Sequence, residues 1–191
     1  MISCHADTGF SSHTLRKLGR GVVEGHLDNF SGVYAVMTAY FSGRMDKDYV
    51  RIELTYGEEK GLIGASEVAG SLNERDVVLV VDVTATPTEK DFVVEKCSQP
   101  ALQAFLREAL AGMEFDLYAD CPDPVSTSDE VDVYSVKCRH TCFIGVPCEG
   151  GDYNAGVVRC RERSLDRIAE ALCRIAERFP GFCGAQKVAL R

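Results

Sequence analysis

The chain has 191 residues, of which 46% are hydrophobic and 26% charged, and its net charge is -8. This acidic balance argues against a nucleic-acid partner, because phosphate binding needs clustered lysine and arginine. No apolar run approaches the roughly 18 residues that span a bilayer, and the N-terminus lacks the basic and apolar regions of a signal peptide. We therefore expect one cytoplasmic domain without a membrane partner.

Segments with helical and strand patterns alternate along the chain. The predicted helices, each with apolar residues at helical spacing, are 28–41, 63–72, a segment opening at Pro100, and 165–179, which Pro180 should end. The predicted strands are 50–56, 77–83, 92–95, 114–118 and 141–146. The polar stretch 120–132 is typical of a loop. This alternation predicts a three-layer α/β/α sandwich around a largely parallel mixed sheet, with the valine-rich run 77–83 as a central strand.

The chain contains nine cysteines, an odd number without a secretion signal. A disulfide framework is therefore not expected. Cys138, Cys142 and Cys148, with His140 among them, form the densest group, and a structural zinc site is one interpretation. Because the spacing lacks paired C-x2-C knuckles, buried free thiols are the favoured interpretation.

Potential metal ligands follow or end several predicted strands, and others open a predicted helix. An aspartate before a helix, such as Asp28, is usually an N-cap, whereas Asp82 lies in a run of valines, where a carboxylate is costly unless it is paired or bound to a metal. The four segments are His5-Ala6-Asp7-Thr8-Gly9, 27–32 (LDNFSG), 57–65 (GEEKGLIGA) and 81–83 (VDV).

Together these segments are more informative than each alone. In open α/β sheets, function gathers at the carboxyl ends of the strands. One imidazole and several carboxylates at successive strand ends could converge on two divalent cations, for which zinc accepts this mixture of ligands. A spare carboxylate could then deprotonate a bound water.

Three motifs, in this order, resemble the dinuclear zinc aminopeptidases and their exopeptidase relatives. They are 26–33 (HLDNFSGV), 57–65 (GEEKGLIGA), and 128–130 (SDE) followed by 144–147 (IGVP). The resemblance implies the phosphorylase/hydrolase-like zinc exopeptidase fold over residues 1–191. Only 22 residues separate His5 from Asp28, so we expect no inserted dimerisation or lid domain.

The resemblance also implies a two-zinc site that removes N-terminal residues from peptides or small aminoacyl substrates. Two metals would polarise the scissile carbonyl and supply hydroxide. The implied roles are zinc binding by His5 and Asp82 at one ion and by Glu59 at the other, bridging of both ions by Asp28, general base for Glu58, and orientation of His5 by Asp7.

The chain departs from the family pattern in one ligand. The family has a further metal-binding histidine after the Gly-Ile-Pro strand, whereas 148–156 (CEGGDYNAG) contains none. We expect Asp152 to take its place, with Glu149 as an alternative, since His140 lies upstream of the strand. The absent histidine also supports an alternative function, a non-catalytic metal-binding or structural relative. The family's usual elements before His5 are missing, which could leave a sheet edge open and favour a homo-oligomer.

Overall fold

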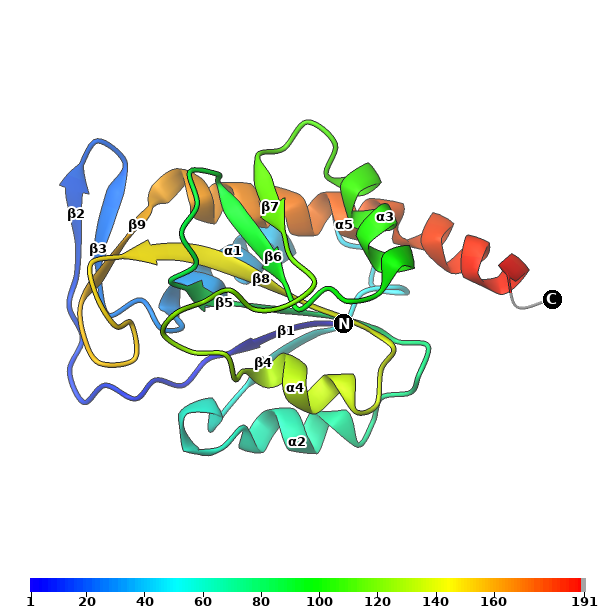
Figure 1. Ribbon diagram of the computed structural model, residues 1–191, viewed down its shortest axis with the longest axis horizontal. Helices are drawn as coiled ribbons and strands as arrows, with labels where there is room; N and C mark the ends of the chain where they lie inside the picture. The colour runs from blue at the N-terminus through cyan, green and yellow to red at the C-terminus, as the bar shows by residue number, and fades with distance from the viewer. Residues whose placement is uncertain (190–191) are drawn as a thin grey trace.

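Figure 1 shows the computed structural model, which describes the backbone of residues 1–189 and the side chains of residues 1–184. Its strands are β1 (Ile2–His5), β2 (Leu15–Gly19), β3 (Val22–Gly25), β4 (Ile52–Thr55), β5 (Val77–Thr84), β6 (Phe92–Glu95), β7 (Phe115–Leu117), β8 (His140–Glu149) and β9 (Val158–Arg161). Its helices are α1 (Phe30–Phe41), the 3-10 turn η1 (Glu58–Lys60), α2 (Ile63–Ala69), α3 (Pro100–Ala109), α4 (Glu130–Ser135) and α5 (Glu162–Ala189).

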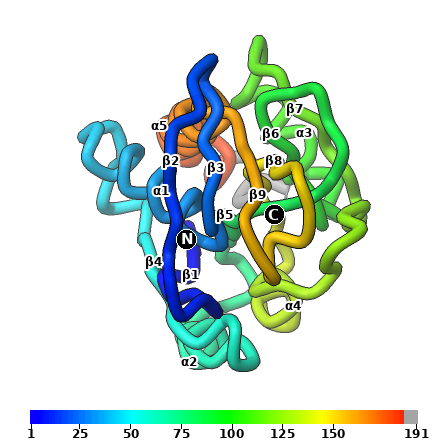
Figure 2. The backbone as a smooth tube through the Cα atoms, turned by 90° about the vertical axis from the view of Figure 1, so that its left-hand side faces the viewer, coloured from blue at the N-terminus to red at the C-terminus, as the bar shows by residue number. Residues whose placement is uncertain are grey.

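The strands form a mixed sheet whose middle is parallel. The main strand order is β2-β3-β9-β8-β5-β1-β4. Strands β4, β1, β5 and β8 run parallel to one another. The hairpin β2–β3 and strand β9 continue the sheet in antiparallel pairs, and Figure 2 shows this hairpin alongside β9. Strand β6 pairs antiparallel with residues 143–145 of β8, and strand β7 pairs with β6 in parallel.

Helices cover both faces of this sheet. Helices α1, α3 and α5 lie on one face, and α2 and α4 lie on the other (Figure 1). Every residue of β5 is buried, as its continuous apolar sequence predicts for a central strand. The predicted three-layer α/β/α architecture is thus confirmed, and the carboxyl ends of β1 and β5 lie at the same edge of the sheet.

Helix α5 continues through Pro180, so the prediction that this proline ends the helix is wrong. A proline removes one backbone hydrogen bond, but its fixed φ remains compatible with a helix. Beyond it, Phe182 packs against Phe105 of α3, Phe179 and the edge of His140. These aromatic contacts stabilise the segment that follows the proline.

Other segments also differ from the sequence prediction. The predicted loop 120–132 includes the start of α4, where the Asp129 carboxylate accepts the Val131 N–H at 2.7 Å. This N-cap begins the helix within polar sequence, which hydrophobic periodicity cannot detect. The β2–β3 hairpin was not predicted either, because all of β2 is exposed and carries no alternating apolar face.

Candidate metal centre

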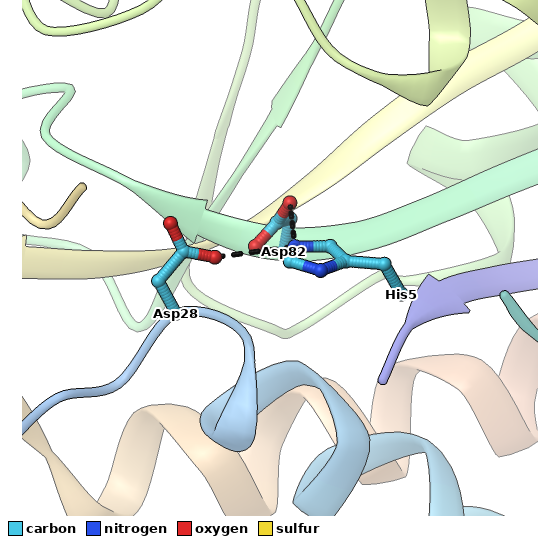
Figure 3. A group of neighbouring side chains, drawn as sticks. All are labelled: His5, Asp28 and Asp82. Atoms are coloured by element: carbon cyan, nitrogen blue, oxygen red, sulfur yellow. Dashed lines mark hydrogen bonds and ion pairs between the residues drawn. The ribbon is translucent and has the colours of Figure 1, made fainter. Parts of the chain in front are cut away.

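Three side chains from three separate segments meet at the edge of the sheet where β1 and β5 end (Figure 3). His5 is the last residue of β1, Asp82 lies near the end of β5, and Asp28 precedes α1. The His5 Nε2 atom lies 3.1 Å from Asp28 Oδ1 and 3.1 Å from Asp82 Oδ2. All three residues are buried, with at most 7% of their surface exposed. Among the described residues, this is the one group of at least three His, Cys, Asp or Glu side chains with ligand atoms close enough to share a metal ion.

Asn29, rather than Asp28, caps helix α1. The Asn29 side-chain oxygen accepts the Gly32 N–H at 3.0 Å, and its amide nitrogen donates to the Val81 carbonyl at 2.9 Å and to Cys4 Sγ at 3.2 Å. These bonds tie the start of α1 to β5 and β1. The interpretation of Asp28 as an N-cap is therefore wrong, and its carboxylate is left to face His5.

Asp7 lies behind the imidazole and connects it to the next segment of the site. Its Oδ1 atom is 3.6 Å from His5 Nδ1 and accepts the backbone N–H of Glu58 at 3.3 Å. The Nδ1 atom is buried and has no hydrogen bond of normal geometry. A carboxylate in this position fixes the ring orientation of a metal-binding histidine.

Glu58 and Glu59 lie in η1, a tight turn bounded by Gly57 and Gly61, whose φ angles are 66° and 101°. Glycine permits these left-handed conformations without steric cost. Burial raises the pKa of Glu58 to about 7, with the charge of His5 opposing this shift and that of Asp28 adding to it. A carboxyl group that titrates near neutrality suits a general base.

The Glu59 carboxylate lies against Gly9, where an added Cβ atom would be 3.1 Å from Glu59 Oε2. Burial and the nearby charge of Asp28 raise the pKa of Glu59, and a hydrogen bond from the Gly9 backbone opposes this. Its Oε1 atom is buried and has no hydrogen-bond partner among the described residues. The structure thus brings Glu59 near Asp28 but outside the group formed by His5, Asp28 and Asp82.

Asp152, the residue expected to replace the absent histidine, is exposed. Its carboxylate accepts the backbone N–H of Asn154 at 2.9 Å within its own loop. The next two residues, Tyr153 and Asn154, line the pocket beside Asp28, and the Tyr153 hydroxyl donates to Asp123 Oδ2 at 2.8 Å. No sequence pattern pointed to Tyr153 or Asp123, because their contact joins two irregular loops.

The buried carboxylate of Glu130 forms hydrogen bonds to strand β1, which ends in His5, and to strand β4. Glu130 is 1% exposed, and it accepts hydrogen bonds from Ser3 of β1 at 2.7 Å and from Thr55 of β4. Burial raises the pKa of Glu130, while these hydrogen bonds lower it. The residue therefore links the start of α4 to β1 and β4, two strands of the sheet that α4 covers.

The thiol group Cys138, Cys142 and Cys148 does not form a common site. Cys138 packs in the apolar cluster with α2 and α4, whereas Cys142 and Cys148 belong to the cluster on the opposite face of the sheet. The latter two are six residues apart on β8, a separation of about 20 Å in an extended strand. A zinc site built on these three thiols is therefore incompatible with the structure.

The chemistry of the donor group fits a divalent cation. One imidazole nitrogen faces two carboxylates, although it can donate a hydrogen bond to only one acceptor at a time. Burial alone would lower the pKa of His5, but Asp82 and Asp28 raise it overall. A cation shared by the three side chains would balance both carboxylates and leave the imidazole neutral, as metal ligation requires.

Comparison with known families connects this geometry to one of them. The model of peptidase family M28 matches residues 1–145, which include the whole donor group. The chain belongs to peptidase family M28. No curated protein matches the chain.

Solved structures share the fold of this M28 chain. A TET aminopeptidase from a marine sediment archaeon of the Thaumarchaeota has a TM-score of 0.70 at 17% identity, covering 89% of this chain and 55% of its own. A TET structure described as a dodecamer has a TM-score of 0.69 at 16% identity, with 85% and 53% covered. An aminopeptidase from the archaeon Desulfurococcus kamchatkensis has a TM-score of 0.68 at 17% identity, with 86% and 51% covered. The chain thus spans about half the length of these proteins.

No helix among the described residues is long and apolar enough to cross a membrane.

Proposed function

We propose that this chain is a metal-dependent peptidase that removes N-terminal residues from peptides or small aminoacyl substrates. The observation that carries the proposal is the buried group of His5, Asp28 and Asp82 beside Glu58, a carboxyl group with a pKa of about 7. Membership of family M28 and the fold shared with aminopeptidases support it. We further propose that residues 1–191 form one catalytic domain, since a short hairpin alone joins β1 to the Asp28 segment.

His5, Asp28 and Asp82 would hold a first divalent ion, with zinc as the expected metal, and Asp28 with Glu59 would contribute to a second. A divalent ion bound there supplies Lewis acidity to the scissile carbonyl and to a bound water. Glu58, in its ionised form, accepts a proton from the attacking water and passes it to the leaving amine. Asp7 positions both His5 and the backbone of Glu58, because one of its oxygens lies close to each of them.

Glu58 distinguishes this function from that of a non-catalytic relative. Glu58 lines the pocket but is not one of the three side chains that could share the metal ion. A purely structural metal site has no need for such an additional carboxyl group. The turn that presents Glu58 is built with two left-handed glycines and a hydrogen bond to Asp7. These features favour catalysis.

The test is hydrolysis of short peptides with free N-termini by protein loaded with zinc, following release of the first residue. We expect activity that a chelator abolishes and that added zinc restores. Asp28→Asn should lose both zinc and activity, while Asp152→Asn, at an exposed position, serves as the matched control and should retain both. Zinc-loaded, folded protein that cleaves none of these peptides would contradict the proposal and favour a non-catalytic relative.

Self-association is a further part of the proposal. Within the described part of the chain, strand β4 pairs with β1 alone, and strand β2 at the opposite end of the sheet is exposed along its length. Open sheet edges can pair with another copy. Light scattering coupled to gel filtration should therefore show a mass above the 20.9 kDa of one chain, and a monomer at all concentrations would contradict this part.

A further inference from the structure

The two metal positions expected in this chain are unequal in the ligands that its residues offer. At the first position, His5, Asp28 and Asp82 present three ligand atoms within 4.8 Å of one another. Three protein ligands with an open fourth position are typical of a catalytic zinc ion. Asp7 lies beside the Nδ1 atom of His5, and Asn29 caps helix α1, which begins just after Asp28. Both contacts hold these ligands in place.

The second position has fewer ligands. It would be shared by Asp28 and Glu59, whose carboxylates are close enough for the charge of Asp28 to raise the pKa of Glu59. The buried, unpartnered Oε1 atom of Glu59 is free to bind a cation. Asp28 would be shared with the first ion, so its negative charge is already partly neutralised when that ion is bound.

The loop between β8 and β9 does not complete this second position. Asp152 is exposed and bonded within the loop, and the Tyr153 hydroxyl, which does reach the pocket, donates to Asp123. His140 lies at the opposite end of β8, with its ring near Phe182. Within the described part of the chain, no third His, Cys, Asp or Glu joins Asp28 and Glu59 in a common group.

We propose that the chain binds one divalent ion firmly through His5, Asp28 and Asp82, and a second only weakly through Asp28 and Glu59. This inference rests on the proposed metal-dependent function. The missing ligand should weaken the second ion by at least the roughly 10–100-fold that loss of a partner around a metal ligand costs. The carboxylates of Asp7, Glu58 and Glu59 still make the position attractive to a cation at high concentration. The single-ion form is then the resting state.

The experiment is a zinc titration against a chromophoric chelator, combined with zinc analysis after desalting. We expect one equivalent to survive desalting and a second binding step at least about 10-fold weaker. Glu59→Gln should remove the weak step alone, and Asp82→Asn should remove the firm step. Asp152→Asn is the matched control and should change neither step. Circular dichroism shows whether each variant is folded.

Several results would overturn the inference. Two zinc ions that both survive desalting would overturn it while leaving the proposed function intact. Persistence of the weak step in Glu59→Gln, or its loss in Asp152→Asn, would show that another residue is the ligand. Folded wild-type protein that binds no zinc would overturn both the inference and the proposed function.

Discussion

Neighbouring residues in η1 have different surroundings, and this difference separates their roles. The backbone N–H of Glu58 donates a hydrogen bond to the Asp7 carboxylate, while the Glu59 carboxylate lies against Gly9. Both pKa values are raised, chiefly by burial, but that of Glu58 reaches about 7. These different surroundings suit the two proposed roles, Glu58 as general base and Glu59 as metal ligand.

The position of Glu58 predicts a pH dependence. Its carboxylate is the active form, so hydrolysis should increase as pH rises through the pKa. Because a bound cation beside His5 and Asp28 favours the carboxylate, the acid limb of kcat/KM should lie below the value of about 7 found in the structure. Values of kcat/KM measured from pH 5 to 9 test this prediction. The control Asp152→Asn should leave the acid limb of the pH profile unchanged. A rate that falls as pH rises from 5 to 7 would contradict the assignment.

Sequence patterns pointed to the three side chains that the structure brings together, His5, Asp28 and Asp82, and they did not point to others for physical reasons. Asp82 lies within a run of valines, and this position indicates a paired or metal-bound carboxylate because an unpaired buried carboxylate is costly. Asp152, expected as a metal ligand, is exposed and does not line the pocket, since a loop without periodicity does not reveal which side chain turns inward. Tyr153 takes that place through a long-range bond to Asp123, and no local pattern encodes such a contact.

At the scale of elements, α4 depends on one residue for its start. Asp129 caps the helix and forms an ion pair with Lys96 at 3.0 Å. Asp129→Ala should lower the free energy of unfolding by about 0.5–2 kcal/mol, the usual cost of losing an N-cap. Denaturant unfolding measures this. Asp129→Asn keeps a capping oxygen and should cost less, and equal losses in the two variants would contradict the capping role.

The elements themselves were largely predictable, because periodic burial dictates them. The valine run of β5 and the apolar stripe of α5 match the structure closely. Prediction failed where tertiary contacts override local preference, as at Pro180, where aromatic packing around Phe182 follows the proline. It failed also at the exposed strand β2, which has no buried face to leave a pattern.

At the scale of the whole molecule, metal binding should be coupled to stability. The ligands come from β1, β5 and the segment before α1, so only the folded chain brings them together. Zinc at 100 times its dissociation constant adds about 2.7 kcal/mol, which raises Tm by roughly 5–10 °C for a chain of this size. Differential scanning fluorimetry measures the shift. Asp82→Asn should show little or none, and an equal shift in that variant would place the zinc elsewhere.

The central claim is that a metal-bound M28 chain uses Glu58 as its base, and hydrolysis by Glu58→Gln tests it most directly. The variant and the wild type would be loaded with zinc, checked for equal metal content, and compared on the same short peptides. The account predicts unchanged firm zinc binding and a loss of kcat of about 10²–10⁴-fold, the usual contribution of a general base. Equal turnover by the two proteins, with equal zinc, would contradict it.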